Sequence, residues 1–168
     1  TGGTSKSDLC DLAGDMTLIM WVYAEDNTER DTIFEKAGTS YQSYEQEIAV
    51  TLETNETLSW YSRKSSYGYA STAAMTQGSW NMMGIKMSTG KTTTRRTGFR
   101  SKNGSSWASA WTSRSTNAIL TAGAVRVGTG YAGPVENGYI NSVYCWTTML
   151  SDAEVLAMYN NTKGKFGL

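Results

Sequence analysis

The chain has 168 residues, enough for one domain with a hydrophobic core. Its 15 basic and 15 acidic residues balance, which argues against charge-driven binding to nucleic acid or to an acidic membrane. The apolar content of 39% argues against disorder, and no apolar run approaches the length that spans a bilayer. Histidine is absent, which excludes the commonest general base and any Ser-His or Cys-His nucleophile.

Strand patterns broken by Gly, Asn, Asp and Ser clusters follow one another along most of the chain, which favours a sandwich or barrel over βαβ units. They include 16–22, 48–52 and 78–87. The first of them, MTLIMWV, is apolar at nearly every position and is predicted to be central and covered on both faces.

Alternation of side chains predicts which faces are buried. Ile48, Val50 and Leu52 share one parity, while Glu45 and Glu47 share the other, so this strand should have one buried face and one wet face. In the same way, alternation in the 78–87 strand points its members to two opposite faces: Met83, Ile85 and Met87 to one, and Met82, Gly84 and Lys86 to the other.

Asn103-Gly104 predicts a tight hairpin, because both residues tolerate the positive φ of a type I′ turn. Beyond the turn, Trp107, Ser109 and Trp111 have one parity. They are predicted to share a face, with the two tryptophans roughly 13 Å apart at about 3.3 Å rise per residue.

The last third of the chain carries the clearest local signals. GAVRVGTG at 123–130 predicts a strand that ends in a Gly-rich turn, and NGYINSVYCW at 137–146 predicts a long strand. LSDAEVLAMY at 150–159 predicts a short helix. Ser151 and Glu154 have the S-x-x-E spacing of a capping box at its start.

These segments, in this order, resemble laminin-G-like (concanavalin A-like) jelly rolls, in which a G-x-I-D-x-V-x-I-W strand precedes L-S-x-x-E-I-x-x-L-Y. The resemblance extends over about residues 8–160. It implies an all-β fold, an antiparallel β-sandwich of the concanavalin A-like jelly-roll type with one short C-terminal helix. We therefore expect one laminin-G-like domain over 1–168, in which 1–7 and 161–168 are flexible or partner-contacting ends.

The chain departs from the family pattern at two places. Asn81 and Met82 stand where family members often carry His, and Asn141 stands where the family has Asp. Many members hold one calcium ion near the sheet edge. For this chain the resemblance leaves calcium as an open expectation, with Asp11, Asp15 and Asn141 as weak candidate ligands, because calcium affinity depends on ligand charge.

Cys10 and Cys145 are the only cysteines, and no Cys-x-x-Cys zinc spacing exists. The position of Cys145, two residues after Val143, is predicted to face the core. In the resembled fold the first and last strands lie side by side, so a bond between the two cysteines and a pair of buried free thiols both remain open.

No catalytic residues are predicted. Glu45-Gln46-Glu47 lacks the spacing and the third acid of the E-x-D-x-x-E strand that jelly-roll glycosidases carry, and two solvated strand carboxylates explain it. A basic cluster could touch phosphate or sulfated glycan, although a solvated hairpin also explains it; its members are Lys91, Arg95, Arg96, Arg100 and Lys102.

Six Trp and ten Tyr exceed what a core of this size needs. Trp21, Trp60, Trp80 and Trp146 are expected in the core. The candidate ligand-binding residues are the loop and hairpin aromatics Tyr61, Tyr67, Tyr69, Trp107, Trp111 and Tyr131. Such rings suit stacking on a sugar, and they equally suit a protein interface or plain packing.

The sequence therefore favours a non-catalytic extracellular or virion-surface module, used for adhesion or decoration, that binds glycans or neighbouring subunits. We expect no binding to nucleic acid and no insertion into a membrane. We expect the domain to form a homo-oligomer or to be part of a larger assembly. The alternatives are a purely structural assembly domain and a glycan-active hydrolase or lyase. The chain begins with Thr1, which fits N-terminal processing or a segment of a longer protein.

Overall fold

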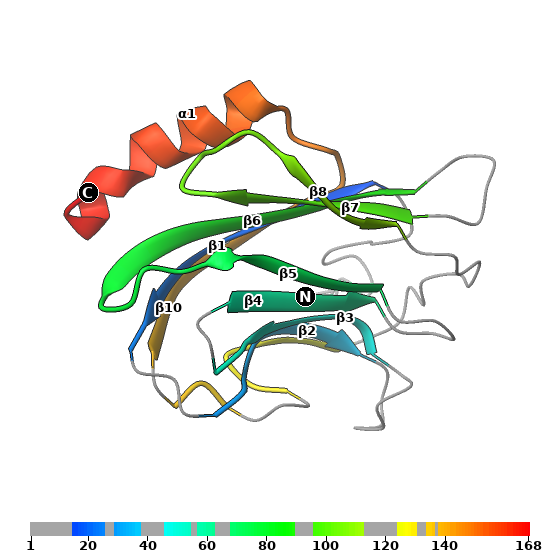
Figure 1. Ribbon diagram of the computed structural model, residues 1–168, viewed down its shortest axis with the longest axis horizontal. Coiled ribbons are helices and arrows are strands. Elements are labelled where there is room, and N and C mark those ends of the chain that lie inside the picture. The colour runs from blue at the N-terminus through cyan, green and yellow to red at the C-terminus, as the bar shows by residue number, and fades with distance from the viewer. Residues whose placement is uncertain are drawn as a thin grey trace, which may run out of the picture.

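The computed structural model is an antiparallel β-sandwich with a short C-terminal helix (Figure 1). It describes residues 15–25, 29–37, 46–54, 57–62, 68–89, 96–112, 124–130, 134–136 and 138–168. For some strand residues it describes the backbone alone: 37, 46–48, 60–62, 68–73, 89, 96–97, 110–112 and 124. The fold class predicted from sequence is confirmed.

The described strands form two five-stranded sheets. The first sheet has the order β10 (Gly138–Trp146), β1 (Met16–Ala24), β6 (Ser79–Thr89), β7 (Arg96–Lys102) and β8 (Ala108–Thr112). The second has the order β5 (Gly68–Ala74), β4 (Thr57–Ser62), β3 (Gln46–Leu52), β2 (Asp31–Ala37) and β9 (Ala124–Val127). The segments predicted as strands all appear, and the pattern analysis did not anticipate β5.

The strand β1 is covered on both faces, as predicted. It lies between β10 and β6, and every residue except Tyr23 is buried. Leu18 and Met20 pack into the core between the sheets, while Ile19 and Trp21 pack on the opposite face. Burying one such apolar side chain stabilises the fold by about 1.5–3 kcal/mol.

The core between the sheets is built largely from one parity of each strand. Met83, Ile85 and Met87 of β6 belong to it, as their alternation predicted, and so do Val50 and Leu52 of β3. Trp60 pairs with Val50 and therefore occupies an inward-facing position.

The prediction that one face of β3 is exposed to solvent is wrong at the described positions. Ala49 and Thr51, on the face away from the core, are only 2% and 3% exposed. Part of this outer face is covered by the segment after β9, because a Cβ added at Gly130 would lie 2.6 Å from Thr32 and 2.8 Å from Glu35. Alternation along one strand reports polarity and cannot detect a covering segment that lies far away in sequence.

Asn103 and Gly104 form the predicted turn between β7 and β8. Their φ angles are +50° and +74°, and the Ser105 N–H donates to the Lys102 carbonyl at 3.0 Å. The Asn103 side chain accepts a hydrogen bond from the Met82 N–H at 2.8 Å, which fixes the turn to β6.

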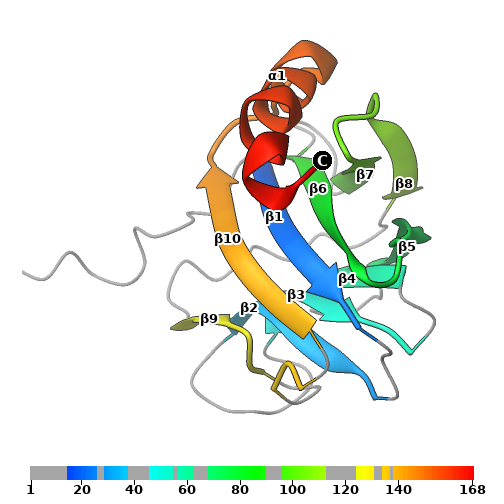
Figure 2. The ribbon, with the colours of Figure 1, turned by 90° about the vertical axis from the view of Figure 1, so that its left-hand side faces the viewer.

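The helix α1 (Asp152–Thr162) lies on the outside of the first sheet, away from the second (Figures 1 and 2). Its capping box is present as predicted: the Ser151 N–H donates to Glu154 at 2.7 Å, and the Glu154 N–H donates to Ser151 Oγ at 3.3 Å. A 3-10 helix, η1 (Lys163–Phe166), follows. None of the helices in the described ranges is long and apolar enough to cross a membrane.

The Asn103–Gly104 turn packs directly beneath α1, which leads to a test of the fold. A Cβ added at Gly104 would lie 2.8 Å from Tyr159 Cβ, and the residue already has a φ that L side chains disfavour. We expect Gly104→Ala to lower the free energy of unfolding by about 2 kcal/mol in urea denaturation.

Gly164→Ala is the matched control, because nothing lies within 4 Å of a Cβ added there. That substitution should be neutral or stabilising by up to about 1 kcal/mol. Equal denaturation midpoints for the two variants would contradict the docking of the turn under α1.

Candidate functional site

A line of exposed and half-buried aromatic, amide and hydroxyl side chains runs along β10, on the outer face of the first sheet. We call it the β10 strip; its members are Tyr139, Asn141, Ser142, Tyr144 and Trp146. Other residues of the strand, Ile140, Val143 and Cys145, pack against the core. The strand therefore has one inward apolar side and one outward aromatic side.

A β-bulge places both tyrosines on the same face. Trp21 pairs with Ser142 and the next residue, Val22, pairs with Ile140, so Asn141 is an extra residue on β10. Without the bulge, Tyr139 and Tyr144 would have opposite parity and would point to opposite faces.

The two tyrosines are the most accessible aromatics of the described residues. Tyr139 is 59% exposed and Tyr144 is 36% exposed. At one end of the strip, the Tyr139 ring lies 5.9 Å from Tyr23; at the other, Tyr144 and Trp146 lie 6.0 Å apart with their planes only 26° from parallel. Each exposed ring is thus supported by a partly buried one.

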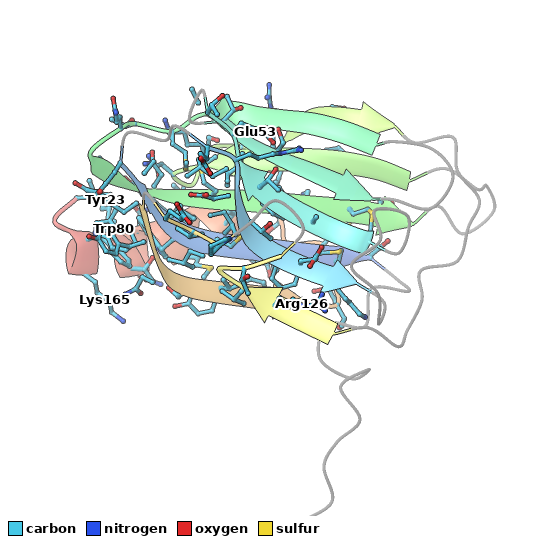
Figure 3. All side chains as sticks on the ribbon, turned by 90° about the horizontal axis from the view of Figure 1, so that it is seen from below. Tyr23, Glu53, Trp80, Arg126 and Lys165 are labelled. Atoms are coloured by element: carbon cyan, nitrogen blue, oxygen red, sulfur yellow. The ribbon has the colours of Figure 1, made fainter. Side chains whose placement is uncertain are left out.

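The support for Tyr139 continues inward to the helix. Tyr23 contacts Trp80 at 5.6 Å, and Trp80 contacts Phe166 of η1 at 4.9 Å. Phe166 in turn stacks on the buried Trp21 at 4.1 Å. Figure 3 shows Tyr23, Trp80 and Lys165 together at one end of the molecule. This chain of contacts restricts the rings before any ligand arrives.

Polar groups lie between the two tyrosines. Asn141 is exposed, and its Oδ1 accepts a hydrogen bond from Ser142 Oγ at 3.1 Å. The strip therefore offers rings for stacking with an amide and a hydroxyl between them. It contains no carboxylate or amine that could act as an acid or base at neutral pH.

Trp107 and Trp111, two of the predicted ligand-binding residues, do not share a face. A register shift pairs Gly98 with Trp111 and Phe99 with Ser109. Gly98 continues the inward row of Met87, whereas Trp107 packs on the helix side. The prediction of a shared face is wrong, because a bulge in β8 changes the parity between the two tryptophans.

The Trp107 ring is half-buried beneath the start of α1. The Lys86 Nζ lies 4.6 Å from its centre and donates to the Leu150 carbonyl at 2.8 Å. The backbone N–H of Trp107 donates to Asp152 Oδ1 at 3.0 Å. These contacts hold the helix on the sheet and occupy one face of the ring with an ammonium group.

The remaining predicted aromatics fall outside the described side chains. Tyr61 and Tyr69 occupy paired positions on β4 and β5, next to Ala49 in the row on the outer face of the second sheet. Tyr67 and Tyr131 lie outside the described residues. The expected core positions of Trp21, Trp80 and Trp146 are confirmed: the first is buried and the other two are partly buried against it.

The two described candidate calcium ligands, Asp15 and Asn141, lie far apart. Asp15 immediately precedes β1, while Asn141 lies opposite Trp21 and Val22, roughly 20 Å along the strand at 3.3 Å per residue. Asp11 lies outside the described residues. Among the described side chains, no three His, Cys, Asp or Glu residues gather as a metal site. Asp15 and Asn141 therefore do not fit one calcium site.

The other chemistry-bearing residues are placed only in part. Cys145 is half-buried against the core, as predicted, while its proposed partner Cys10 lies outside the described residues. Glu45 and the side chain of Glu47 lie outside them too. From the basic cluster, the Lys102 Nζ donates to the Ala74 carbonyl at 2.6 Å, which ties β7 to the end of β5.

The family resemblance of 137–146 points to the fold, and the ligand-binding candidates drawn from the sequence do not include Tyr139 or Tyr144. The signal was present, since both tyrosines flank Asn141 in a segment without charge. Their exposure depends on the strand order, which leaves β10 at the edge of the described sheet, and on a bulge that residue spacing does not reveal.

No protein-family model and no curated protein matches the chain by sequence. Solved structures match its fold. A heptameric SAP-like pentraxin from Limulus polyphemus superposes with a TM-score of 0.61 and 18% identity, over 88% of this chain and 70% of the pentraxin. The CBM40 of Ruminococcus gnavus IT-sialidase, bound to alpha2,3 sialyllactose, superposes with a TM-score of 0.62 and 12% identity. The match covers 88% of this chain and 83% of the CBM40.

The receptor binding domain of botulinum neurotoxin C/D mosaic serotype gives a TM-score of 0.59 and 11% identity, over 91% of this chain and 37% of that one. The Trypanosoma rangeli sialidase gives a TM-score of 0.57 and 11% identity, over 88% of this chain but only 23% of the enzyme. These similarities show that the chain has a β-sandwich fold of the jelly-roll type.

The contacts of Lys86 generate a pH prediction. Desolvation by burial lowers the pKa of Lys86 from 10.5, and the carboxylates of Asp152 and Glu154 oppose that shift. A lowered folded-state pKa means that the unfolded chain binds more protons, so this group favours folding increasingly as pH rises towards 10.5.

The free energy of unfolding of the wild type, relative to Lys86→Met, should therefore increase between neutral pH and 10.5. Chemical denaturation of both proteins at several pH values measures this difference. A difference that shrinks with rising pH would show that burial does not dominate at Lys86.

Proposed function

We propose that this domain is a non-catalytic carbohydrate-binding module and that the β10 strip is its contact surface. The observation that carries the proposal is the pair of exposed tyrosines, Tyr139 and Tyr144, with Asn141 between them on a single strand. Flat rings stack on the C–H faces of pyranoses, and amides or hydroxyls between them bond sugar hydroxyls.

The rigidity of the rings supports this role. Tyr139 rests on Tyr23, which in turn contacts Trp80, and Tyr144 rests on Trp146, so binding restricts little motion that is not already restricted. A site ordered in advance loses less conformational entropy when its ligand binds.

The fold comparisons support a binding role over catalysis. The CBM40, of which the chain covers 83%, was solved with a sialylated sugar bound, whereas the chain covers only 23% of the sialidase. A hydrolase commonly uses a pair of positioned carboxylates, and the outward residues of the strip include no carboxylate.

The order of the C-terminal motifs supports a laminin-G-like domain that spans the whole chain. We propose that it works on a cell or virion surface in adhesion or decoration, as part of an oligomer or larger assembly. Its partner there is a glycan or a neighbouring surface protein, since aromatic surfaces serve both kinds of contact. A purely structural assembly domain is the competing hypothesis, in which protein covers the strip.

The test is a glycan-array screen of the folded domain, followed by titration with the best ligand. We expect Tyr139→Ala and Tyr144→Ala each to weaken binding about tenfold, or ~1.4 kcal/mol, through the loss of a stacking ring. Because both side chains are exposed to solvent, the melting temperatures of the two variants should stay close to that of the wild type.

Val127→Ala is the matched control. Val127 is 49% exposed but lies on β9 of the second sheet, so its removal should leave the affinity unchanged. Affinity that survives both tyrosine substitutions would exclude the strip as the site. A folded domain that binds no glycan would favour the structural assembly role.

A further inference from the structure

We infer that the β10 strip selects extended, uncharged glycan chains and discriminates against sialylated or sulfated ones. This inference rests on the proposed function and names the class of its ligand. It differs from the ligand of the CBM40, which was solved with alpha2,3 sialyllactose.

The first argument is the lack of charge on the strip. No residue from 138 to 146 is an acid, lysine or arginine, and the outward residues of the neighbouring β1 are Thr17, Ile19, Trp21 and Tyr23. An acidic sugar bound here would lose water around its carboxylate or sulfate without gaining a cationic partner on these two strands. Burying an unpaired charge is strongly unfavourable.

Lys86, the lysine that faces outward on β6, cannot serve as the cationic partner of an acidic sugar. Lys86 is only 9% exposed, and its ammonium group already donates to the Leu150 carbonyl and lies between Phe99 and Trp107. A ligand carboxylate would have to compete with these contacts for an ammonium group that is almost fully buried.

The residues that border the strip have charges of both signs. Lys165 lies near Tyr23 and Trp80 (Figure 3), while the exposed Glu25 directly follows Ala24, which pairs with Gly138 beside Tyr139. Because both signs of charge lie there, this end of the strip is not a purely cationic surface of the kind that attracts acidic ligands.

The length of the strip argues for a chain over a single sugar. Tyr139 and Tyr144 lie roughly 15 Å apart at about 3.3 Å per residue, which exceeds the width of one pyranose ring. Both rings are exposed, so neither closes an end of the strip. A ligand that contacts both must extend along β10, and the interior of a chain fits as well as its end.

The experiment compares Kd values by isothermal titration calorimetry for two groups of probes. The uncharged group consists of cello-, xylo-, malto- and chito-oligosaccharide ladders, from monosaccharide to hexasaccharide. The acidic group consists of alpha2,3 sialyllactose and heparin oligosaccharides. Each titration is repeated between about 0.05 and 0.5 M NaCl, because salt screens ionic contacts and leaves stacking largely unchanged. Tyr139→Ala, Tyr144→Ala and the Val127→Ala control are measured beside the wild type.

We expect one uncharged ladder to bind, with affinity that rises at least about tenfold from monosaccharide to tetrasaccharide and changes less than about twofold with salt. Both tyrosine variants should lose most of that gain with length, because each removes one end of the contact. Val127→Ala should reproduce the wild-type series.

Tighter binding of sialyllactose or heparin oligosaccharides, weakened by salt and by the tyrosine substitutions, would overturn the inference while the proposed function stands. A monosaccharide that binds as tightly as its hexasaccharide would overturn it as well. If neither tyrosine substitution changes the affinity for glycans, or if no probe binds, the proposed function and the inference are both overturned.

Discussion

The two-sided burial of β1 is the constraint on which the other parts of this structure depend. Leu18 and Met20 fill the space between the sheets, while Ile19 and Trp21 form the surface on which α1 packs. A strand that is apolar on both faces needs a cover on each. The second sheet supplies one cover, and the C-terminal helix with its 3-10 extension supplies the other.

The position of that helix determines where the first sheet remains open. The helix is tied down by Lys86 and Trp107, on the side of β6 and β7, and it ends with Phe166 on Trp21. It therefore lies beside β10, which forms the edge of the described sheet (Figure 2), and leaves the Tyr139 and Tyr144 side chains exposed. The same packing that completes the core produces the exposed aromatic surface to which we assign ligand binding.

The outer face of the second sheet differs in kind. It carries buried polar residues, with Glu35 only 2% exposed and paired with Arg126 at 3.1 Å. Glu35 and Arg126 are thus engaged with each other, whereas the β10 strip offers rings and an amide to solvent. Composition distributes polar and aromatic residues over both sheets, and packing decides which of them can meet a ligand.

The sequence by itself determined the local structure of this protein. The unbroken apolar run of 16–22, the capping box of Ser151 and Glu154, and the Asn103-Gly104 turn each reappear, because each depends on neighbours within a few residues. The C-terminal motif order also identified the sandwich. Only the tertiary structure decided the site. Whether Tyr139 or Trp107 is exposed depends on strand order, on bulges beside Asn141 and before Trp111, and on where α1 lies. These are contacts between residues far apart in sequence, and the alternation of a single strand contains no information about them.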